Sequence, residues 1–198
     1  MKFKVYKFDS VTSTNDVAIN LIKNKKKISG CVLANKQTKG KGTNGKKWIS
    51  PRGNLFSSLF FPLEKKYPPF SQFAIINPVI ISNVIKKLCY KKKINLKFPN
   101  DIFLSKKKVC GTLQEVISLN NRKFLIIGIG ININIRPAVN NNYQATSILF
   151  ETKKKYNIKK IVDLIISSYE KFFLGINFYN YKNYKEKAKL MALKKYKI

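Results

Sequence analysis

The spacing of the apolar residues changes along this chain, and this change constrains the fold more than any other feature. Up to about residue 135, apart from two stretches with helical spacing, apolar residues form runs of strand length, separated by segments that contain Gly, Pro and Asn. From residue 145 onward, they recur at the three- and four-residue spacing of amphipathic helices. Strands followed by helices predict an α+β fold, which we expect to be a mixed sheet with helices on one side.

The same patterns predict individual elements. We expect strands at 3–8, 30–35, 54–61, 94–98, 102–104, 109–117 and 124–135. We expect helices from residue 14 to about 25 and at 70–90, 158–174 and 179–193. Ser13 followed by Asp16 resembles the capping box that begins a helix, with Asp in place of the usual Glu. Residues 36–47 contain three glycines and almost no apolar residue, which predicts a mobile loop.

Composition limits the chemistry and the location. The chain has 198 residues, of which 44% are hydrophobic, and this suits a single domain over residues 1–198. Histidine is absent, which excludes Ser-His-Asp catalysis, Cys-His catalysis and histidine metal sites. Three cysteines without CxxC spacing predict a reducing compartment and no zinc site. Without a signal peptide or an apolar run of membrane-spanning length, we expect a cytoplasmic protein that does not bind membranes.

The formal net charge of +31 has two explanations. A basic surface is typical of a nucleic-acid-binding module. Alternatively, composition has drifted toward Lys together with Ile and Asn. The basic residues are almost all Lys, with Arg only at positions 52, 122 and 136. Proteins that recognise bases usually employ Arg as well. We therefore favour drift and expect no specific DNA binding.

Two segments contain residues suited to charged ligands. Residues 37–53, QTKGKGTNGKKWISPRG, place glycines and lysines before Trp48, which suits closure over an anionic nucleotide. Residues 97–111, KFPNDIFLSKKKVCG, place Asp101 after a proline turn and Lys108 after a hairpin tip. The carboxylate can hold Mg²⁺ or accept a proton from an amine, and the lysine can neutralise developing charge. A solvated loop and an Asx turn explain the same segments without a ligand.

Two further segments suit polar recognition. Residues 127–134, IGIGININ, contain glycines that permit close approach to the backbone, followed by Asn132. Residues 13–15, STN, place two hydroxyls and an amide at the start of a predicted helix. A buried glycine-rich strand and an ordinary helix cap are the alternatives without a ligand.

In this order, the four segments resemble the catalytic domain of biotin–protein ligases. The family's GRGRxGRxW loop is similar to GKGTNGKKW at residues 40–48. Its KWPND…K…G element is similar to KFPND with Lys108 and Gly111, its GIGINxN strand to GIGININ at 128–134, and its STN to residues 13–15. The resemblance extends from about residue 6 to the C-terminus and implies the class II synthetase-like fold of biotin/lipoate ligase catalytic domains.

The resemblance implies a function and a set of site residues. The activity would be ATP-dependent formation of biotinyl-5′-AMP and transfer of biotin to a lysine of the biotin carboxyl carrier protein of acetyl-CoA carboxylase. The implied catalytic residues are Lys108, Asp101 and Lys41, and the implied biotin contacts are Ser13, Thr14, Asn15, Gln37, Gly40, Lys41, Lys108 and Gly111. The implied ATP or adenylate contacts are Lys46, Trp48, Asn100 and Asn132. Mg²⁺ is expected with ATP, without a direct protein ligand, and many family members form homodimers.

The chain departs from the family pattern in its glycine-rich loop and at both ends. Thr43 replaces the second loop arginine, which removes a charge-assisted contact worth about 1.5–3 kcal/mol and predicts weaker retention of the adenylate. The residues before Ser13 are too few for a DNA-binding helix-turn-helix. The chain ends about where many members begin a small β domain. We therefore expect a catalytic domain that lacks the N-terminal DNA-binding domain and a complete C-terminal β domain.

Two other functions remain open from the sequence. Lipoate and octanoate ligases or transferases share the architecture, but their RRxxGGG-like stretch and catalytic Cys–Lys pair are missing from the pattern here. Cys110 lies near Lys108 in the sequence, and we interpret it as a packing residue. The second alternative is a basic nucleic-acid-binding module, which would bind with strongly salt-dependent affinity.

Overall fold

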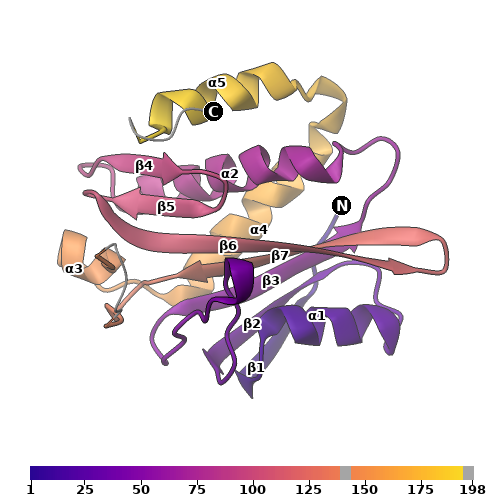
Figure 1. The fold of residues 1–198 in the computed structure, drawn as a ribbon, viewed down its shortest axis with the longest axis horizontal. Coiled ribbons are helices and arrows are strands. Elements are labelled where there is room, and N and C mark those ends of the chain that lie inside the picture. The colour runs from indigo at the N-terminus through magenta and orange to yellow at the C-terminus, as the bar shows by residue number, and fades with distance from the viewer. Residues whose placement is uncertain (139–143, 194–198) are drawn as a thin grey trace.

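The computed structural model describes residues 1–138 and 144–193, and its centre is a mixed seven-stranded sheet (Figure 1). The strands are β1 (Val5–Val11), β2 (Gly30–Gln37), β3 (Leu55–Pro62), β4 (Ile94–Lys97), β5 (Asp101–Leu104), β6 (Lys107–Leu119) and β7 (Arg122–Ile131). Their order across the sheet is β1-β2-β3-β7-β6-β5-β4. β1 and β2 run parallel, and the other neighbours are antiparallel. The α+β class with a mixed sheet is confirmed.

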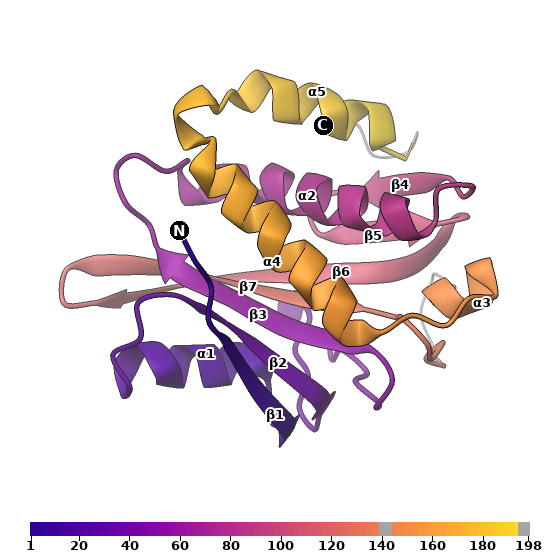
Figure 2. The same ribbon diagram turned by 180° about the vertical axis from the view of Figure 1, so that it is seen from behind.

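Helices cover both faces of the sheet (Figures 1 and 2). The helices are α1 (Thr14–Lys23), α2 (Phe73–Leu88), α3 (Ile148–Thr152), α4 (Ile158–Leu174) and α5 (Tyr181–Met191), with short 3₁₀ turns at Thr43–Gly45, Phe70–Gln72 and Ile176–Phe178. The sequence predicts helices on one side, and α2 and α4 do share one face. In contrast, α1 lies on the opposite face, because it forms the crossover that two parallel neighbours such as β1 and β2 require.

The apolar core is divided by the sheet. Side chains of β3 alternate between the two faces, so Leu59 and Phe61 join the large core beneath α2 and α4, whereas Phe60 joins a smaller core beneath α1. Every residue of β3 is buried, which explains why its sequence LFSSLFFP lacks the polar alternation of a half-exposed strand. The smaller core occupies only part of the α1 face, and the remainder of that face is left for a cavity.

Most predicted elements lie where their patterns place them, with shifts of one to a few residues at the ends. The helix predicted at 158–174 is α4, with the same bounds, while that predicted at 179–193 is shorter and spans Tyr181–Met191. Pro78 lies inside α2. Within the described ranges, no helix is long and apolar enough to cross a membrane.

Candidate functional site

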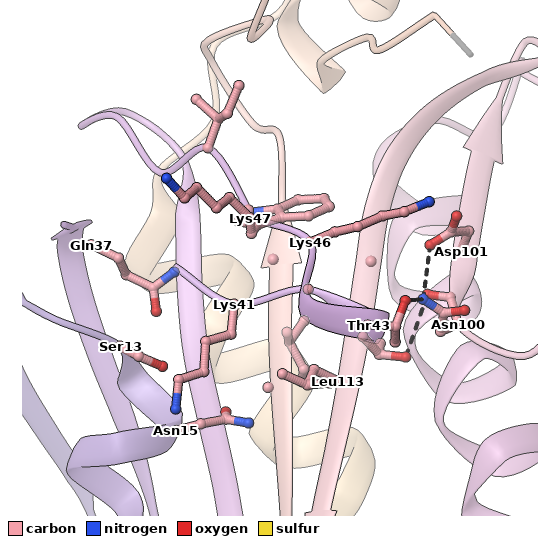
Figure 3. A pocket seen from close by; sticks show the side chains of 18 of the residues that line it. Ser13, Asn15, Gln37, Lys41, Thr43, Lys46, Lys47, Asn100, Asp101 and Leu113 are labelled. Carbon is pink, nitrogen blue, oxygen red and sulfur yellow. Dashed lines mark hydrogen bonds between the residues drawn. The ribbon is translucent and has the colours of Figure 1, made fainter. Parts of the chain in front are cut away.

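A cavity of about 880 Å³ opens on the α1 face of the sheet, beside the N-terminal end of α1 (Figure 3). Its lining comes from residues 13–15, 37–49, 97–113 and 128–130, so all four segments identified in the sequence contribute to it. Ser13, Thr14 and Asn15 begin α1, while Gln37 ends β2. Asn100 and Asp101 lie at the turn into β5, on the opposite side. The fold therefore gathers into one place residues that are up to 117 positions apart.

One side of the cavity is lined by Thr14, Asn15 and Gln37. These residues belong to a connected set of hydrogen bonds that we call the polar wall, formed by Thr14, Asn15, Gln37, Ser50, Ser58 and Glu115. The Thr14 amide donates to Gln37 Oε1 over 2.8 Å, and the Thr14 hydroxyl lies 3.1 Å from the same oxygen. Gln37 Nε2 donates to Ser50 Oγ over 2.9 Å. Ser58 Oγ lies 2.7 Å from Thr14 Oγ1 and 2.5 Å from Asn15 Oδ1, and Asn15 Nδ2 donates to Glu115 over 2.5 Å. The internal bonds hold these side chains in fixed orientations.

Residues 40–48 form a hairpin over the cavity, whereas the sequence predicts a mobile loop. The Gly42 amide donates to the Lys46 carbonyl over 2.7 Å, and the Trp48 amide donates to the Gly40 carbonyl over 2.9 Å. Gly45 at the tip has φ +71°, a conformation that glycine adopts without strain. These bonds join polar backbone groups, which apolar periodicity does not report.

Side-chain contacts fix the hairpin at both sides of the cavity, and Figure 3 shows those made by Asn100. On the α1 side, Lys41 forms an ion pair with Asp16, and this hydrogen bond raises the pKa of Lys41. On the other side, Asn100 Nδ2 lies 3.5 Å from Thr43 Oγ1 and 3.1 Å from Asp101 Oδ1. The predicted capping box is not formed, because Asp16 pairs with Lys41 and the Ser13 side chain makes no capping bond within the described chain.

Trp48 lies against the sheet over two glycines. Gly111 of β6 and Gly130 of β7 are direct cross-strand partners. A Cβ atom at Gly111 would lie 2.8 Å from the indole, and one at Gly130 would overlap it. The sequence predicts close approach of a ligand to these glycines, and here the protein's own indole makes that approach. Among the described residues, Trp48 Nε1 is buried without a hydrogen-bond partner.

Lys108 lies beside the indole and is paired with an acid. Its Nζ is 2.7 Å from Asp101 Oδ1 and 5.3 Å from the centre of the Trp48 ring. Both members of the ion pair are buried, so the two charges interact with little screening by water. A lysine, a carboxylate and an aromatic face therefore lie within reach of one ligand in the cavity.

Two of the predicted contact residues do not line the cavity. Gly40 lies behind it, where a Cβ atom would be 2.5 Å from Ser50 Oγ and 3.0 Å from Gln37 Nε2. Asn132 is buried, and its Nδ2 donates to the Thr146 carbonyl over 3.0 Å. Its Oδ1 has no partner among the described residues. Asn132 thus supports the segment next to Lys108, whose backbone exchanges hydrogen bonds with residues 144 and 146. The other predicted site residues all line the cavity.

Sequence reasoning missed four residues that support the site: Asp16, Ser50, Ser58 and Glu115. Ser58 is fully buried in β3, and a polar residue inside an apolar run was the available signal. Glu115 follows the alternation of a half-exposed strand, so nothing local distinguished it from a solvated residue.

The cavity offers few metal ligands, and its neighbouring thiol is buried. Within the described residues, no group of three or more His, Cys, Asp or Glu side chains lies close enough together to hold a metal ion. Cys110 is fully buried, and burial raises the pKa of its thiol well above the usual range. A thiol in this state is a poor nucleophile, which supports its interpretation as a packing residue.

Comparisons with known proteins agree on one family. Residues 7–132 match the model of the Biotin/lipoate A/B protein ligase family. The chain is 32% identical over 128 residues to the bifunctional ligase/repressor BirA of Escherichia coli, covering 64% of this chain and 39% of that protein. It is 28% identical over 170 residues to biotin–protein ligase 2 of Arabidopsis thaliana, covering 82% of this chain and 49% of that protein. The chain therefore spans half or less of the length of these relatives.

Solved structures show the same similarity in three dimensions. The biotin protein ligase of Aquifex aeolicus in complex with biotin and ATP has a TM-score of 0.80 and 26% identity, covering 96% of this chain and 78% of that one. The Leishmania major enzyme in complex with biotinyl-5-AMP has a TM-score of 0.80 and 27% identity, covering 98% and 83%.

Proposed function

Since the chain belongs to the Biotin/lipoate A/B protein ligase family, we propose that it converts biotin and ATP to biotinyl-5′-AMP and then transfers biotin to a lysine of a biotin carboxyl carrier protein. The observation that supports this most is that residues of the polar wall, Lys108 and the Trp48 indole line the same cavity. A polar head group, a carboxylate and a flat base are the three parts of the proposed reactants. Relatives described with biotin, ATP and biotinyl-5-AMP support the same assignment.

The polar wall suits the cyclic urea of biotin. A urea has one carbonyl oxygen, which accepts hydrogen bonds, and two N–H groups, which donate them. Ser13, Asn15 and Gln37 line the cavity with side chains that can do both. Because internal hydrogen bonds already fix the Asn15 and Gln37 side chains, binding costs little further conformational entropy there. We assign this end of the cavity to the urea.

Formation of the adenylate depends on positioning and on neutralising charge. The biotin carboxylate would attack the α-phosphate of ATP, and pyrophosphate would leave. Lys108 Nζ would stabilise the negative charge on the phosphate oxygens, and Lys41 and Lys46 add positive charge from the hairpin. Trp48 provides an aromatic surface for the adenine. Excluding water through the hairpin would protect the mixed anhydride from hydrolysis.

The side chains that line the cavity also limit how Mg²⁺ could be bound. Among the described residues that line the cavity, Asp101 supplies a carboxylate, and it is already paired with Lys108. This arrangement fits an ion held mainly by the phosphates of ATP, with at most one protein ligand. When bound, Mg²⁺ would neutralise phosphate charge.

We assign Asp101 to the transfer step. An adenylate phosphate that draws Lys108 Nζ toward itself would free the Asp101 carboxylate, 2.7 Å away, to accept a proton from the acceptor lysine. The neutral amine would then attack the biotinyl carbonyl and expel AMP. Asn100, 3.1 Å from Asp101 Oδ1, holds the carboxylate in position during this exchange.

The proposal is tested by mass spectrometry of purified protein incubated with MgATP and either biotin or lipoate. We expect biotinyl-AMP with biotin and no adenylate with lipoate. Addition of a biotin carboxyl carrier domain should then yield a single biotinylated lysine. An adenylate formed with lipoate alone, or no adenylate with either acid, would refute the proposed function.

A further inference from the structure

The polar wall ends at two groups that can only accept hydrogen bonds. At one end, Ser50 Oγ donates to the Trp48 carbonyl over 2.8 Å. At the other end, Asn15 Nδ2 donates to the Glu115 carboxylate over 2.5 Å. A carbonyl oxygen and an ionised carboxylate have no proton to give, so they determine the direction of every bond that leads to them.

Starting from Glu115, the directions follow in order. The carboxylate requires the NH₂ side of the Asn15 amide, which turns Asn15 Oδ1 toward Ser58. Ser58 Oγ has one proton but contacts both Asn15 Oδ1 and Thr14 Oγ1, at 2.5 and 2.7 Å. Because Asn15 Oδ1 has no proton, Ser58 donates its proton to Asn15 Oδ1. The Thr14 hydroxyl then donates its own proton to Ser58 Oγ.

The opposite end fixes Gln37 in the same way. The proton of Ser50 is used by the Trp48 carbonyl, so Ser50 accepts from Gln37 Nε2. Gln37 Oε1 then faces the Thr14 amide, 2.8 Å away. The amides of Asn15 and Gln37 each use one N–H internally and keep a second one, and both residues line the cavity.

Glu115 does not line the cavity, whereas Asn15 does. The Asn15 amide lies directly on β7, since a Cβ atom at Gly128 would be 2.5 Å from Asn15 Oδ1. Gly128 is the cross-strand partner of both Ser58 on β3 and Leu113 on β6. The amide therefore sits across three strands, with Ser58 on one side and Glu115 on the other.

We propose that Glu115 is a positioning residue that sets the orientation of the Asn15 amide and thereby selects a ligand whose head group offers a hydrogen-bond acceptor. This inference rests on the proposed function, in which that acceptor is the urea oxygen of biotin. A neutral amide at position 115 could donate to Asn15 instead of accepting from it. Asn15 Oδ1 would then point toward residue 115, and the Asn15 side chain would present a different arrangement of hydrogen-bond donors and acceptors to the ligand.

The test compares Glu115→Gln with the wild-type protein in adenylate formation. We expect the KM for biotin to rise at least about tenfold, because a urea group would face an unmatched partner. The KM for ATP and the kcat at saturating biotin should stay within about twofold. A general loss of folded protein would not raise the KM for biotin while leaving the KM for ATP unchanged. An unchanged KM for biotin would overturn the inference.

Glu170→Gln is the matched control. The Glu170 carboxylate also accepts hydrogen bonds, from Lys2 Nζ over 2.9 Å and from the Phe3 amide over 3.1 Å. Glu170 lies on α4, away from the cavity. Its KM for biotin should equal that of the wild-type protein, and thermal unfolding of both variants reports the cost of losing a carboxylate.

A double-mutant cycle tests whether Glu115 acts through Asn15. In an Asn15→Ala background, Glu115→Gln should change the KM for biotin by less than about twofold. Additive losses would overturn the inference. Should Glu115→Gln fail to fold, Ser58→Ala breaks the same chain of bonds, and an unchanged KM for biotin in that variant would also overturn it. A wild-type protein that forms no biotinyl-AMP would instead refute the proposed function.

Discussion

At the scale of single residues, Lys108 has the most demanding environment. Its ammonium group is buried between a carboxylate and an aromatic face, at 2.7 Å from Asp101 and 5.3 Å from the Trp48 ring centre. A buried charge is tolerated only with such partners. Because Asp101 is the partner, an anionic ligand must compete with an internal acid for the same lysine.

Lys108→Ala should therefore slow adenylate formation by about 10²–10³, as for the loss of one donor that stabilises charge in a transition state. Single-turnover formation of biotinyl-AMP measures the effect. Lys91→Ala, an exposed lysine near Tyr90, is the control. A loss smaller than tenfold for Lys108→Ala would contradict the role.

A substitution at Gly130 tests how the Trp48 indole packs against the sheet. Gly130→Ala should displace Trp48, because the added methyl group would overlap the ring. Trp48 is the single tryptophan of the chain, so its fluorescence reports the displacement directly. We expect red-shifted emission and weaker binding of the adenylate. Gly175→Ala, where the added atom lies 3.5 Å from the nearest backbone oxygen, should leave both unchanged; an unshifted spectrum in Gly130→Ala would argue against the packing described.

Single residues also show which parts of the candidate site could be predicted from the sequence and which could not. Lys108, Asp101 and Gln37 could be predicted as candidate site residues, because their residue types and spacing match the motifs of a known family, and all three line the cavity. Asp16 and Glu115 could not, since their partners Lys41 and Asn15 are 25 and 100 positions away. Asn132 was expected at the adenine; it does not line the cavity and donates to the Thr146 carbonyl, and its contact with the adenine stays a prediction.

At the scale of elements, the hairpin at residues 40–48 is the feature that local patterns describe least well. Its glycines and lysines indicate a loop, but its shape depends on backbone bonds and on contacts with Asp16 and Asn100. The strands and α4 follow apolar periodicity and could be predicted. The place of α1 could not, because it depends on the parallel pairing of β1 with β2.

Thr43 at the hairpin tip gives an element-scale prediction. Thr43→Arg should slow dissociation of biotinyl-AMP, because a guanidinium at this position adds a charge-assisted contact to the phosphate. Its neighbours Asn100 and Asp101 provide acceptors that would hold the new side chain near the cavity. Dissociation of the labelled intermediate, followed over time, measures the effect. Thr43→Lys at the same site separates charge from bidentate geometry, and an unchanged off-rate in both variants would end the idea.

At the scale of the whole molecule, the two ends of the described chain share one core. Phe3 packs against Phe61 and Phe173, with ring centres 6.1 Å apart in both pairs, and Phe61 lies 4.8 Å from Phe173. The N-terminal segment, β3 and α4 are thus parts of one cluster. A cluster of this kind favours loss of structure in a single step.

We therefore expect urea unfolding to be cooperative, with coincident transitions in Trp48 fluorescence and far-UV circular dichroism. Trp48 reports the cavity, and circular dichroism reports the helices and the sheet. The expectation of one domain over residues 1–198 stays a prediction until this measurement. Two separated transitions would contradict it.

The polar wall has a further consequence for the life of the protein. Its six residues lie between positions 14 and 115, on α1, β2, β3, β6 and the segment before β3, so the wall exists only when the chain is fully folded. A ligand that binds it binds the native state alone, and at 100 times its dissociation constant it adds about 2.7 kcal/mol to the free energy of unfolding. Proteases cleave the unfolded chain. The supply of the small molecule would then govern how long each copy of the protein survives, as well as how fast it works.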